Sequence, residues 1–256
     1  FILRASNNKL EFMSGNGVIF TLLELVGDKL YDSKKYVEFM FPNRLMIDIC
    51  RIFLSKINDE NVRIFKSDID HGNYIKFETE IFKMRLVGLP SDLTWPDAWS
   101  LFKREFSNKY ITKIADWRQS VSGSMATYTN QMQKNNEPHK VCITPNHKKM
   151  YFELKTKSIL KSKRKVNIFN FVGDDTFDCY TYTYLLGAMI RICKPDEYIQ
   201  LEMGQKEDTG VKCMVATYHA NEKVSDRSKL FLENDALNVK ERISQVIIQT
   251  QEDNNV

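Results

Sequence analysis

An α+β fold built from two copies of one unit is predicted by three observations in this sequence. Short runs rich in β-branched and aromatic residues alternate with polar turns, as is typical of antiparallel strands. Two segments, around residues 43–58 and 181–193, show the apolar spacing of a helix instead. These segments align at a constant offset of 140 residues, since Ile49-Cys50-Arg51-Ile52 matches Met189-Ile190-Arg191-Ile192.

Length and composition are those of an ordinary folded protein with two domains. The chain has 256 residues and a formal net charge of +4, whereas a typical domain has roughly 100–150 residues. Hydrophobic residues make up 43% and charged residues 27%, which excludes the collagen-like and disordered classes. Charges interrupt every apolar run before the roughly 20 residues that a membrane span needs. Five widely spaced cysteines indicate reduced, buried thiols in an intracellular compartment.

Strands around a single helix are predicted for residues 1–97. The strongest signal is a hairpin, because Asn16-Gly17 supplies the positive φ angles that its turn needs. A later strand stops at Pro42, and Asn43 then caps the helix. The predicted strands cover residues 9–13, 18–25, 36–41, 61–67, 74–79 and 81–87.

A connector with two prolines, residues 88–96, places the domain boundary near residue 98. Beyond it we expect a strand over 101–107 and a helix from Asn108 to about Val121, followed by a polar loop over 122–138. This additional strand and helix have no counterpart in the first copy, so we expect their equivalents upstream of Phe1. Further strands are predicted over 139–145, 149–155, 178–180, 197–201, 211–218 and 229–232.

The C-terminal tail carries Val239, Ile243, Val246 and Ile247 at near-helical spacing, which predicts a helix that packs on the protein or recruits another. The domain boundaries are therefore 1–97 for the first domain, 98–236 for the second and 237–256 for the tail.

Segments 8–14, 18–25, 41–53 and 82–90 together resemble the sliding clamps of DNA replication, which include PCNA, the bacterial β clamp and the phage clamps. The last segment is similar to the strand that closes a bacterial clamp domain and to its short Leu-Pro exit. The resemblance covers residues 1–235. It implies two repeated clamp-like domains, with antiparallel sheets outside and helices on an inner face, in a ring of six such units.

The function that this resemblance implies is that of a DNA polymerase processivity factor, a non-catalytic ring that tethers replication proteins to double-stranded DNA. Its partners would be a DNA polymerase and a clamp loader, and two units per chain imply a homotrimer. No cofactor and no metal are expected. The high Lys, Asn and Ile content suits an AT-rich viral or phage genome.

Basic side chains on the inner helices are what such a ring needs, because it holds phosphates without reading bases. Arg44 and Arg51 lie two helical turns apart and share a face with Asp48. Lys109 and Lys113 share a face in the same way. The same charges also suit the solvated side of any amphipathic helix. The predicted DNA-binding residues are Arg44, Arg51, Lys56, Lys109, Lys113, Arg118, Arg191 and Lys194.

Leu89, Leu93, Trp95 and Trp99 are predicted to bind partners, because clamp partners insert a short hydrophobic peptide beside the connector. An alternative is that the tryptophans pin the connector against the two cores. The basic segment 155–165 is a phosphate-contacting surface or a solvated loop, or else its residues 161–165 are a nuclear-import signal. The expected location is accordingly the cytoplasm or nucleoid, or else the nucleus.

Catalysis finds little support, because the GxxxxGK[ST], GxSxG and HExxH patterns are absent and the four histidines are scattered. Two other functions stay open. One is a clamp-fold transcription or checkpoint factor, which keeps the architecture and changes the partner. The other is a β-rich single-stranded nucleic-acid-binding protein, in which exposed aromatic residues interleave with basic residues on strands.

Overall fold

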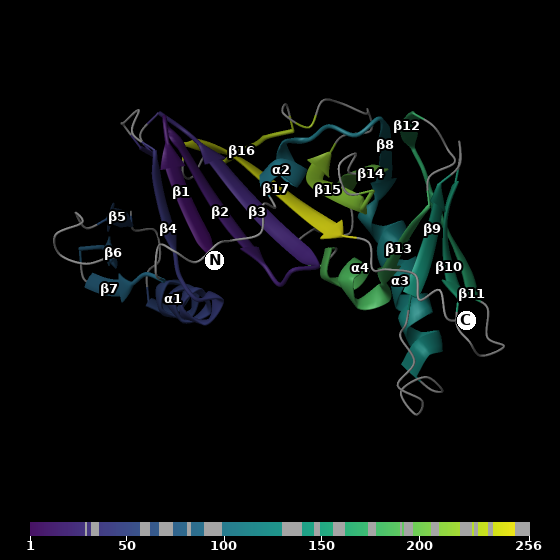
Figure 1. The fold of residues 1–256 in the computed structure, drawn as a ribbon, viewed down its shortest axis with the longest axis horizontal. Coiled ribbons are helices and arrows are strands. Elements are labelled where there is room, and N and C mark those ends of the chain that lie inside the picture. Colours follow the sequence, from purple (N-terminus) through teal and green to yellow (C-terminus); the bar gives the residue numbers. More distant parts are fainter. Residues whose placement is uncertain are drawn as a thin grey trace. The chain divides into compact units, whose positions relative to one another are not determined.

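Two compact units make up the chain in a computed structural model (Figure 1). The first unit comprises Phe1–Gly15, Leu22–Pro96 and Asn234–Lys240, and the second comprises Asn16–Thr21, Asp97–Glu233 and Glu241–Val256. The structure describes residues 1–28, 30–31, 36–56, 62–66, 74–80, 83–89, 99–129, 140–145, 149–155, 162–173, 178–189, 191, 197–205, 210–220, 227, 230–234 and 238–248.

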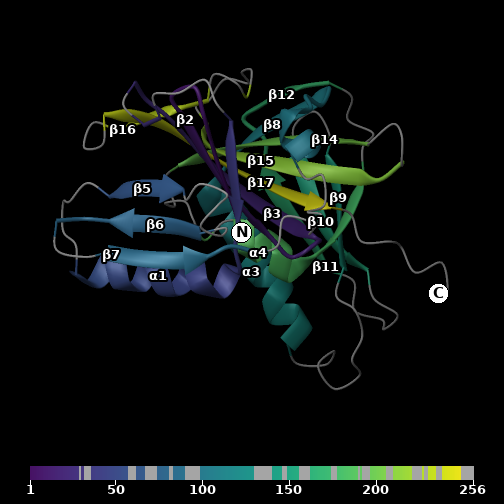
Figure 2. The ribbon, with the colours of Figure 1, turned by 60° about the vertical axis from the view of Figure 1, so that its left-hand side comes forward.

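The described part of the first unit contains one helix and strands of two antiparallel sheets. One sheet has the strand order β3-β2-β1-β4, and the other has the order β5-β6-β7. Figure 2 shows helix α1 lying along the second sheet. The elements are β1 (Ile2–Ser6), β2 (Lys9–Gly15), β3 (Ile19–Val26), β4 (Val37–Met40), α1 (Asn43–Lys56), β5 (Arg63–Lys66), β6 (Tyr74–Glu78) and β7 (Lys83–Val87).

Local signals place β2, β3 and α1 where the sequence predicts them, whereas β1 was not predicted. At the predicted turn, Asn16 Oδ1 accepts the backbone N–H groups of Val18 and Ile19 at 3.2 and 3.0 Å, and Gly17 has a φ of +90°. Helix α1 begins at Asn43, as predicted. The core of this unit is a buried cluster that joins α1 to both sheets, and it contains Leu3, Phe39, Phe41, Ile49, Ile75, Phe77 and Leu86.

Among the residues described for the second unit there are three helices and strands of two sheets. One sheet has the strand order β11-β10-β9-β13, and the other runs β12-β8-β14-β15-β17. The elements are α2 (Trp99–Lys103), β8 (Asn108–Lys113), α3 (Ile114–Thr129), β9 (Lys140–Pro145), β10 (Lys149–Lys155), β11 (Ser162–Asn167), β12 (Asn170–Val172), β13 (Cys179–Tyr182), α4 (Thr183–Met189), β14 (Tyr198–Gln205), β15 (Lys212–Ala220), β16 (Leu232–Asn234) and β17 (Val239–Ile248).

The two units repeat one strand order. The order β3-β2-β1-β4 in the first unit has the same connections as β11-β10-β9-β13 in the second. Helix α1 follows β4 as α4 follows β13, which is the helix pair that the 140-residue offset predicts. The strands after each helix also agree, since β5-β6-β7 corresponds to β14-β15-β17. Strands β7 and β11 are thus the terminal strands of their sheets.

Three sequence predictions for the second unit are wrong. Trp99–Lys103 is a helix, although residues 101–107 predict a strand. The helix predicted from Asn108 begins only at Ile114, because residues 108–113 form β8 between β12 and β14. The same helix continues to Thr129 through residues predicted to be a loop.

The predicted C-terminal helix is also wrong, because Val239–Ile248 is strand β17. Its residues Ser244, Gln245, Val246 and Ile247 are all buried, so both faces of the strand are covered. A strand buried on both faces loses the alternation that distinguishes it from a helix. In the second unit the strand that follows β15 in the sheet, as β7 follows β6 in the first unit, is β17 and not the predicted strand 229–232.

Gly204 on β14 is the position where an added methyl group meets the least space. A β-carbon there would lie 1.9 Å from Cδ1 of buried Phe106, whose N–H donates to Glu202 Oε2 at 3.3 Å. We expect Gly204→Ala to lower the free energy of unfolding by about 1–3 kcal/mol, as overpacking does, in urea denaturation. The control is Gly187→Ala on α4, where the nearest atom lies 3.6 Å away. Equal effects of the two substitutions would contradict the packing described here.

Candidate nucleic-acid interface

Helix α1 presents two of the predicted DNA-binding arginines on its exposed face. Arg44 and Arg51 are both exposed, whereas Ile49 faces the core. Asp48 lies between the arginines, with its Oδ1 3.8 Å from Arg51 Nη1. An exposed ion pair of this length is weak, so it leaves Arg51 able to bind another anion. Lys56 ends the helix, and its side chain lies outside the described part of the chain.

Lys109 and Lys113 do not share a helix face, because both lie on strand β8. The side chain of Lys109 is only 14% exposed, and its Nζ lies 3.7 Å from Glu105 Oε2. The ammonium group of Lys113 lies 5.7 Å from the ring centroid of Tyr198. Both lysines therefore have partners within the second unit, which makes them weaker candidates for phosphate contacts than Arg44 and Arg51.

The helices of the second unit carry little positive charge. Arg118 is half-buried and is the only basic residue in the sequences of α3 and α4. Asp116, two residues earlier on α3, carries the opposite charge and accepts a hydrogen bond from Asn167 Nδ2 at 3.0 Å. Arg191 follows α4 and is exposed. Lys194 lies outside the described residues.

The structure separates the predicted partner-binding residues. Leu89 is half-buried, and its N–H donates to the carbonyl of Met40 at 2.8 Å. Trp99 is only 5% exposed, so its ring belongs to the core around α2 and does not present a surface anchor. Leu93 and Trp95 lie outside the described residues. Of the predicted partner-binding residues that the structure describes, Leu89 is therefore the one whose side chain stays partly exposed.

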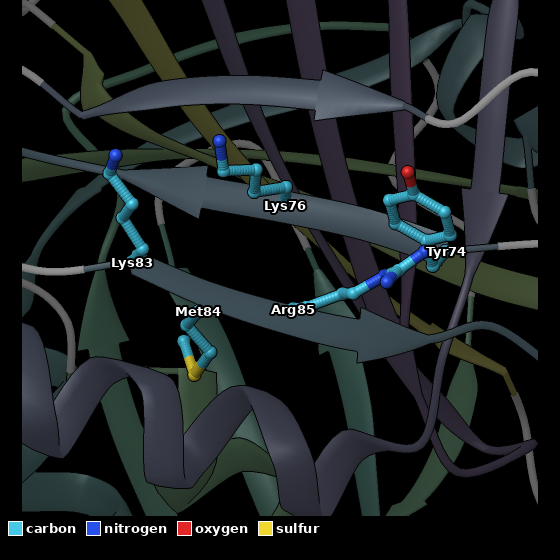
Figure 3. Close-up of a pocket in the computed structure, with 5 residues that line it drawn as sticks. All are labelled: Tyr74, Lys76, Lys83, Met84 and Arg85. Atoms are coloured by element: carbon cyan, nitrogen blue, oxygen red, sulfur yellow. The ribbon is translucent and has the colours of Figure 1, made fainter.

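A basic surface that the sequence analysis missed covers one side of the first unit's smaller sheet. We call it the β5–β7 face. Alternate residues of the three strands point to it, while Met84 points to the opposite side, toward α1 (Figure 3). Its members are Arg63 and Phe65 on β5, Tyr74, Lys76 and Glu78 on β6, and Lys83, Arg85 and Val87 on β7.

Strand pairing arranges these side chains in rows across the sheet. Phe65 lies opposite Lys76, and Lys76 lies opposite Arg85. In the next row, Glu78 lies opposite both Arg63 and Lys83. The period-two spacing of charges within each strand was visible in the sequence. The pairing that gathers them was not, because it joins residues from three separate strands.

Glu78 is the single acidic residue on this face, and two lysines share it. Its carboxylate oxygens lie 2.5 Å from Lys76 Nζ and 3.1 Å from Lys83 Nζ. Hydrogen bonds from Lys76 and then Lys83 hold the pKa of Glu78 below its usual value. The carboxylate therefore stays charged in mildly acidic solution, and the face keeps the same charge pattern there.

A shallow pocket of about 240 Å³ lies on the β5–β7 face (Figure 3). Tyr74, Lys76, Lys83, Met84 and Arg85 line it, and the guanidinium carbon of Arg85 lies 3.4 Å from the ring centroid of Tyr74. This stacking fixes the planar cation over the aromatic ring. The pocket thus offers fixed cations and an aromatic edge to an anionic ligand.

Strand β11 carries a second basic group. Lys163 pairs with Glu153 at 2.6 Å, and its ammonium lies 4.3 Å from the ring centroid of Tyr151. Desolvation and the neighbouring ammonium of Lys149 lower the pKa of Lys165. Lys163 and Lys165 belong to the basic segment 161–165, and from Ser162 onward this segment forms strand β11 and not a loop.

Three cysteine side chains that the structure describes, those of Cys142, Cys179 and Cys213, are buried. Burial raises the pKa of Cys179 to about 12, which makes this thiol a weak nucleophile. Among residues whose positions the structure describes, no cluster of three or more His, Cys, Asp or Glu side chains is placed to hold a metal ion. Within the same residues, no helix is long and apolar enough to cross a membrane.

Solved structures of bacterial replication proteins match this chain. No protein-family model and no curated protein sequence matches it. The DNA polymerase III beta chain of Streptococcus pneumoniae TIGR4 matches with a TM-score of 0.69 at 13% identity, over 98% of this chain and 56% of that one. The beta subunit of Thermotoga maritima gives a TM-score of 0.68 at 12% identity, over 98% and 57%.

A third match is the sliding clamp of Pseudomonas aeruginosa bound to griselimycin, with a TM-score of 0.68 at 11% identity, over 98% of this chain and 57% of that one. The chain has the sliding-clamp fold. The resemblance predicted from the sequence is thereby confirmed at the level of the fold, and the chain spans less than two thirds of the length of these clamps. At this identity the sliding-clamp fold does not assign a role to any residue.

Proposed function

We propose that this chain is a subunit of a sliding clamp that encircles duplex DNA and tethers a DNA polymerase. The observation that carries the proposal is the fold match over 98% of the chain to bacterial DNA polymerase III beta subunits. The exposed arginines of α1 support it, because a ring that slides needs long cations that contact phosphates without reading bases.

The proposed mechanism is avidity and requires no catalytic step. A polymerase bound to the ring stays near the primer end, so that its dissociation is followed by rapid rebinding. In this proposal residues 1–97 form one clamp domain and the residues from 98 onward, β17 included, form the other, with sheets on the outside of the ring and helices inside. A clamp loader opens the ring, and partner peptides dock beside Leu89.

A homotrimer is the assembly we propose, because two units per chain then give a ring of six. Copies would join head to tail through β7 of one chain and β11 of the next, since these are the terminal strands of their sheets. Heterologous contacts of this kind close into a ring when the rotation between copies allows it.

The test combines solution mass with retention on DNA. Light scattering is expected to give three times the chain mass of 30.0 kDa, and the protein should stay on nicked circular DNA but slide off linear DNA. Joint charge reversal by Arg44→Glu and Arg51→Glu is expected to make the negative slope of log affinity against log salt shallower by about 2, since each lost phosphate contact contributes about 0.9 to its magnitude.

The control is a single charge reversal, Lys103→Glu, at an exposed residue at the end of α2. It should leave retention and salt slope unchanged. A strict monomer at high protein concentration, or equal loss from circular and linear DNA, would refute the self-closing ring.

A further inference from the structure

We propose that the β5–β7 face binds single-stranded nucleic acid. This inference goes beyond the ring and does not depend on it, because α1 covers the other side of the same sheet (Figure 3). A duplex held by Arg44 and Arg51 and a single strand held by this face would therefore contact opposite sides of the first unit's smaller sheet.

Charge on this face selects an anionic ligand. Four cations, those of Arg63, Lys76, Lys83 and Arg85, share the face with the one carboxylate of Glu78. The face is therefore more basic than the exposed side of α1, where Asp48 opposes two arginines. Basic side chains spread over three strands suit a flexible polyanion that can follow them.

Aromatic rings on the same face favour nucleic acid over an acidic peptide. Phe65 is 46% exposed, and Lys76 Nζ lies 5.4 Å from its ring centroid. Tyr74 lies two residues from Lys76 along β6, which places the Cα atoms of Phe65 and Tyr74 on a diagonal roughly 7–8 Å long across the paired strands, with both side chains on the same face. Bases of any sequence stack on such rings, whereas carboxylates have no π-face to offer.

The guanidinium group of Arg85 adds a third stacking surface to the rings of Phe65 and Tyr74. The guanidinium plane of Arg85 is itself a surface on which a base can stack, and it is held 3.4 Å from the Tyr74 centroid. Lys83 lies two residues before Arg85 on β7, so its side chain is on the same face. Its Nζ lies 3.1 Å from Glu78 Oε1, which orients the ammonium group, and it can still reach a phosphate. Stacking groups and phosphate-binding groups thus alternate across one pocket of about 240 Å³.

Binding is measured by fluorescence anisotropy with a labelled oligothymidylate of about 15 nucleotides, in the upper range of single-strand site sizes. The unaltered chain should bind at low salt and lose affinity as salt rises. Phe65→Ala is expected to weaken binding roughly 5- to 150-fold, which corresponds to the loss of one stacked base. Phe65 is exposed, so circular dichroism should show an unchanged fold.

Lys83→Glu is compared with Lys163→Glu as a matched pair. Each lysine is exposed, at 66% and 57%, and each pairs with one glutamate. Only Lys83→Glu should weaken binding, by about tenfold or more. Equal effects of the two variants would overturn the assignment of the site to β5–β7.

Two further results would overturn the proposal. One is an unaltered chain that does not bind the oligothymidylate at low salt. The other is displacement by an oligoglutamate peptide together with no effect of Phe65→Ala, which would make the face a docking surface for an acidic partner. Failure here is distinguishable from failure of the ring, because Phe65→Ala should leave retention on nicked circular duplex unchanged.

Discussion

Replacing Trp117 by alanine is expected to lower the free energy of unfolding by about 3–5 kcal/mol, the usual cost of removing a fully buried tryptophan. Trp117 on α3 has no exposed surface. Its ring meets Phe152 of β10 edge-on at 4.8 Å, and its Nε1–H donates to the carbonyl of Leu186 on α4 at 3.4 Å. One side chain therefore joins two helices and a sheet, and its removal leaves a cavity that these elements cannot all close.

Urea denaturation followed by circular dichroism tests this, because the substitution removes a fluorophore. The control is Gln119→Ala, an exposed position on the same helix, which is expected to change stability by no more than about 0.5 kcal/mol. A cost below about 1 kcal/mol for Trp117→Ala would mean that the core of the second unit is not organised around this ring.

Removing Arg227 is expected to destabilise the protein by about 3–5 kcal/mol, because it leaves a buried carboxylate without its counter-ion. Glu202 on β14 is completely buried, and Arg227 Nε lies 3.6 Å from its Oε1. The same carboxylate accepts hydrogen bonds from Gln200 Nε2 at 3.1 Å and from the N–H of Phe106 at 3.3 Å. The guanidinium of Arg227 also donates to the carbonyl of Arg104.

A double-mutant cycle separates this ion pair from simple loss of packing. Arg227→Met alone should be strongly destabilising, whereas Arg227→Met combined with Glu202→Gln should recover a large part of the loss, since no buried charge then lacks its counter-ion. The measurement is the midpoint and slope of urea unfolding for all four proteins. Strictly additive effects would show that the two side chains do not interact.

The sequence predicts the first unit well because its signals are local. Asn16-Gly17 encodes a turn and Pro42-Asn43 encodes a helix start, and both act within a few residues. The second unit is harder, because strands β8 and β17 are buried on both faces. In β8, Tyr110, Ile111 and Thr112 are consecutive and all buried, so no alternation marks them as a strand.

The residues of the candidate interface show the same difference between local signals, which the sequence reveals, and tertiary arrangement, which it does not. Arg44 and Arg51 are exposed on the helix that local signals predict, so helical spacing alone identifies them. The same reasoning assigned Lys109 and Lys113 to a helix. The assignment is wrong because that helix starts only at Ile114, after both lysines. The β5–β7 face was missed because strand register, which depends on tertiary packing, brings its charges together.

The terminal strands β7 and β11 give the proposed ring an electrostatic property of its own. Lys83 and Arg85 lie on one, and Lys163, Arg164 and Lys165 on the other, so joining two copies there brings like charges together. Salt screens this repulsion and therefore favours closure, although salt also weakens the contacts that hold DNA phosphates. Ring closure and DNA binding would then respond to ionic strength in opposite directions, which confines a stable, loaded ring to an intermediate range of salt.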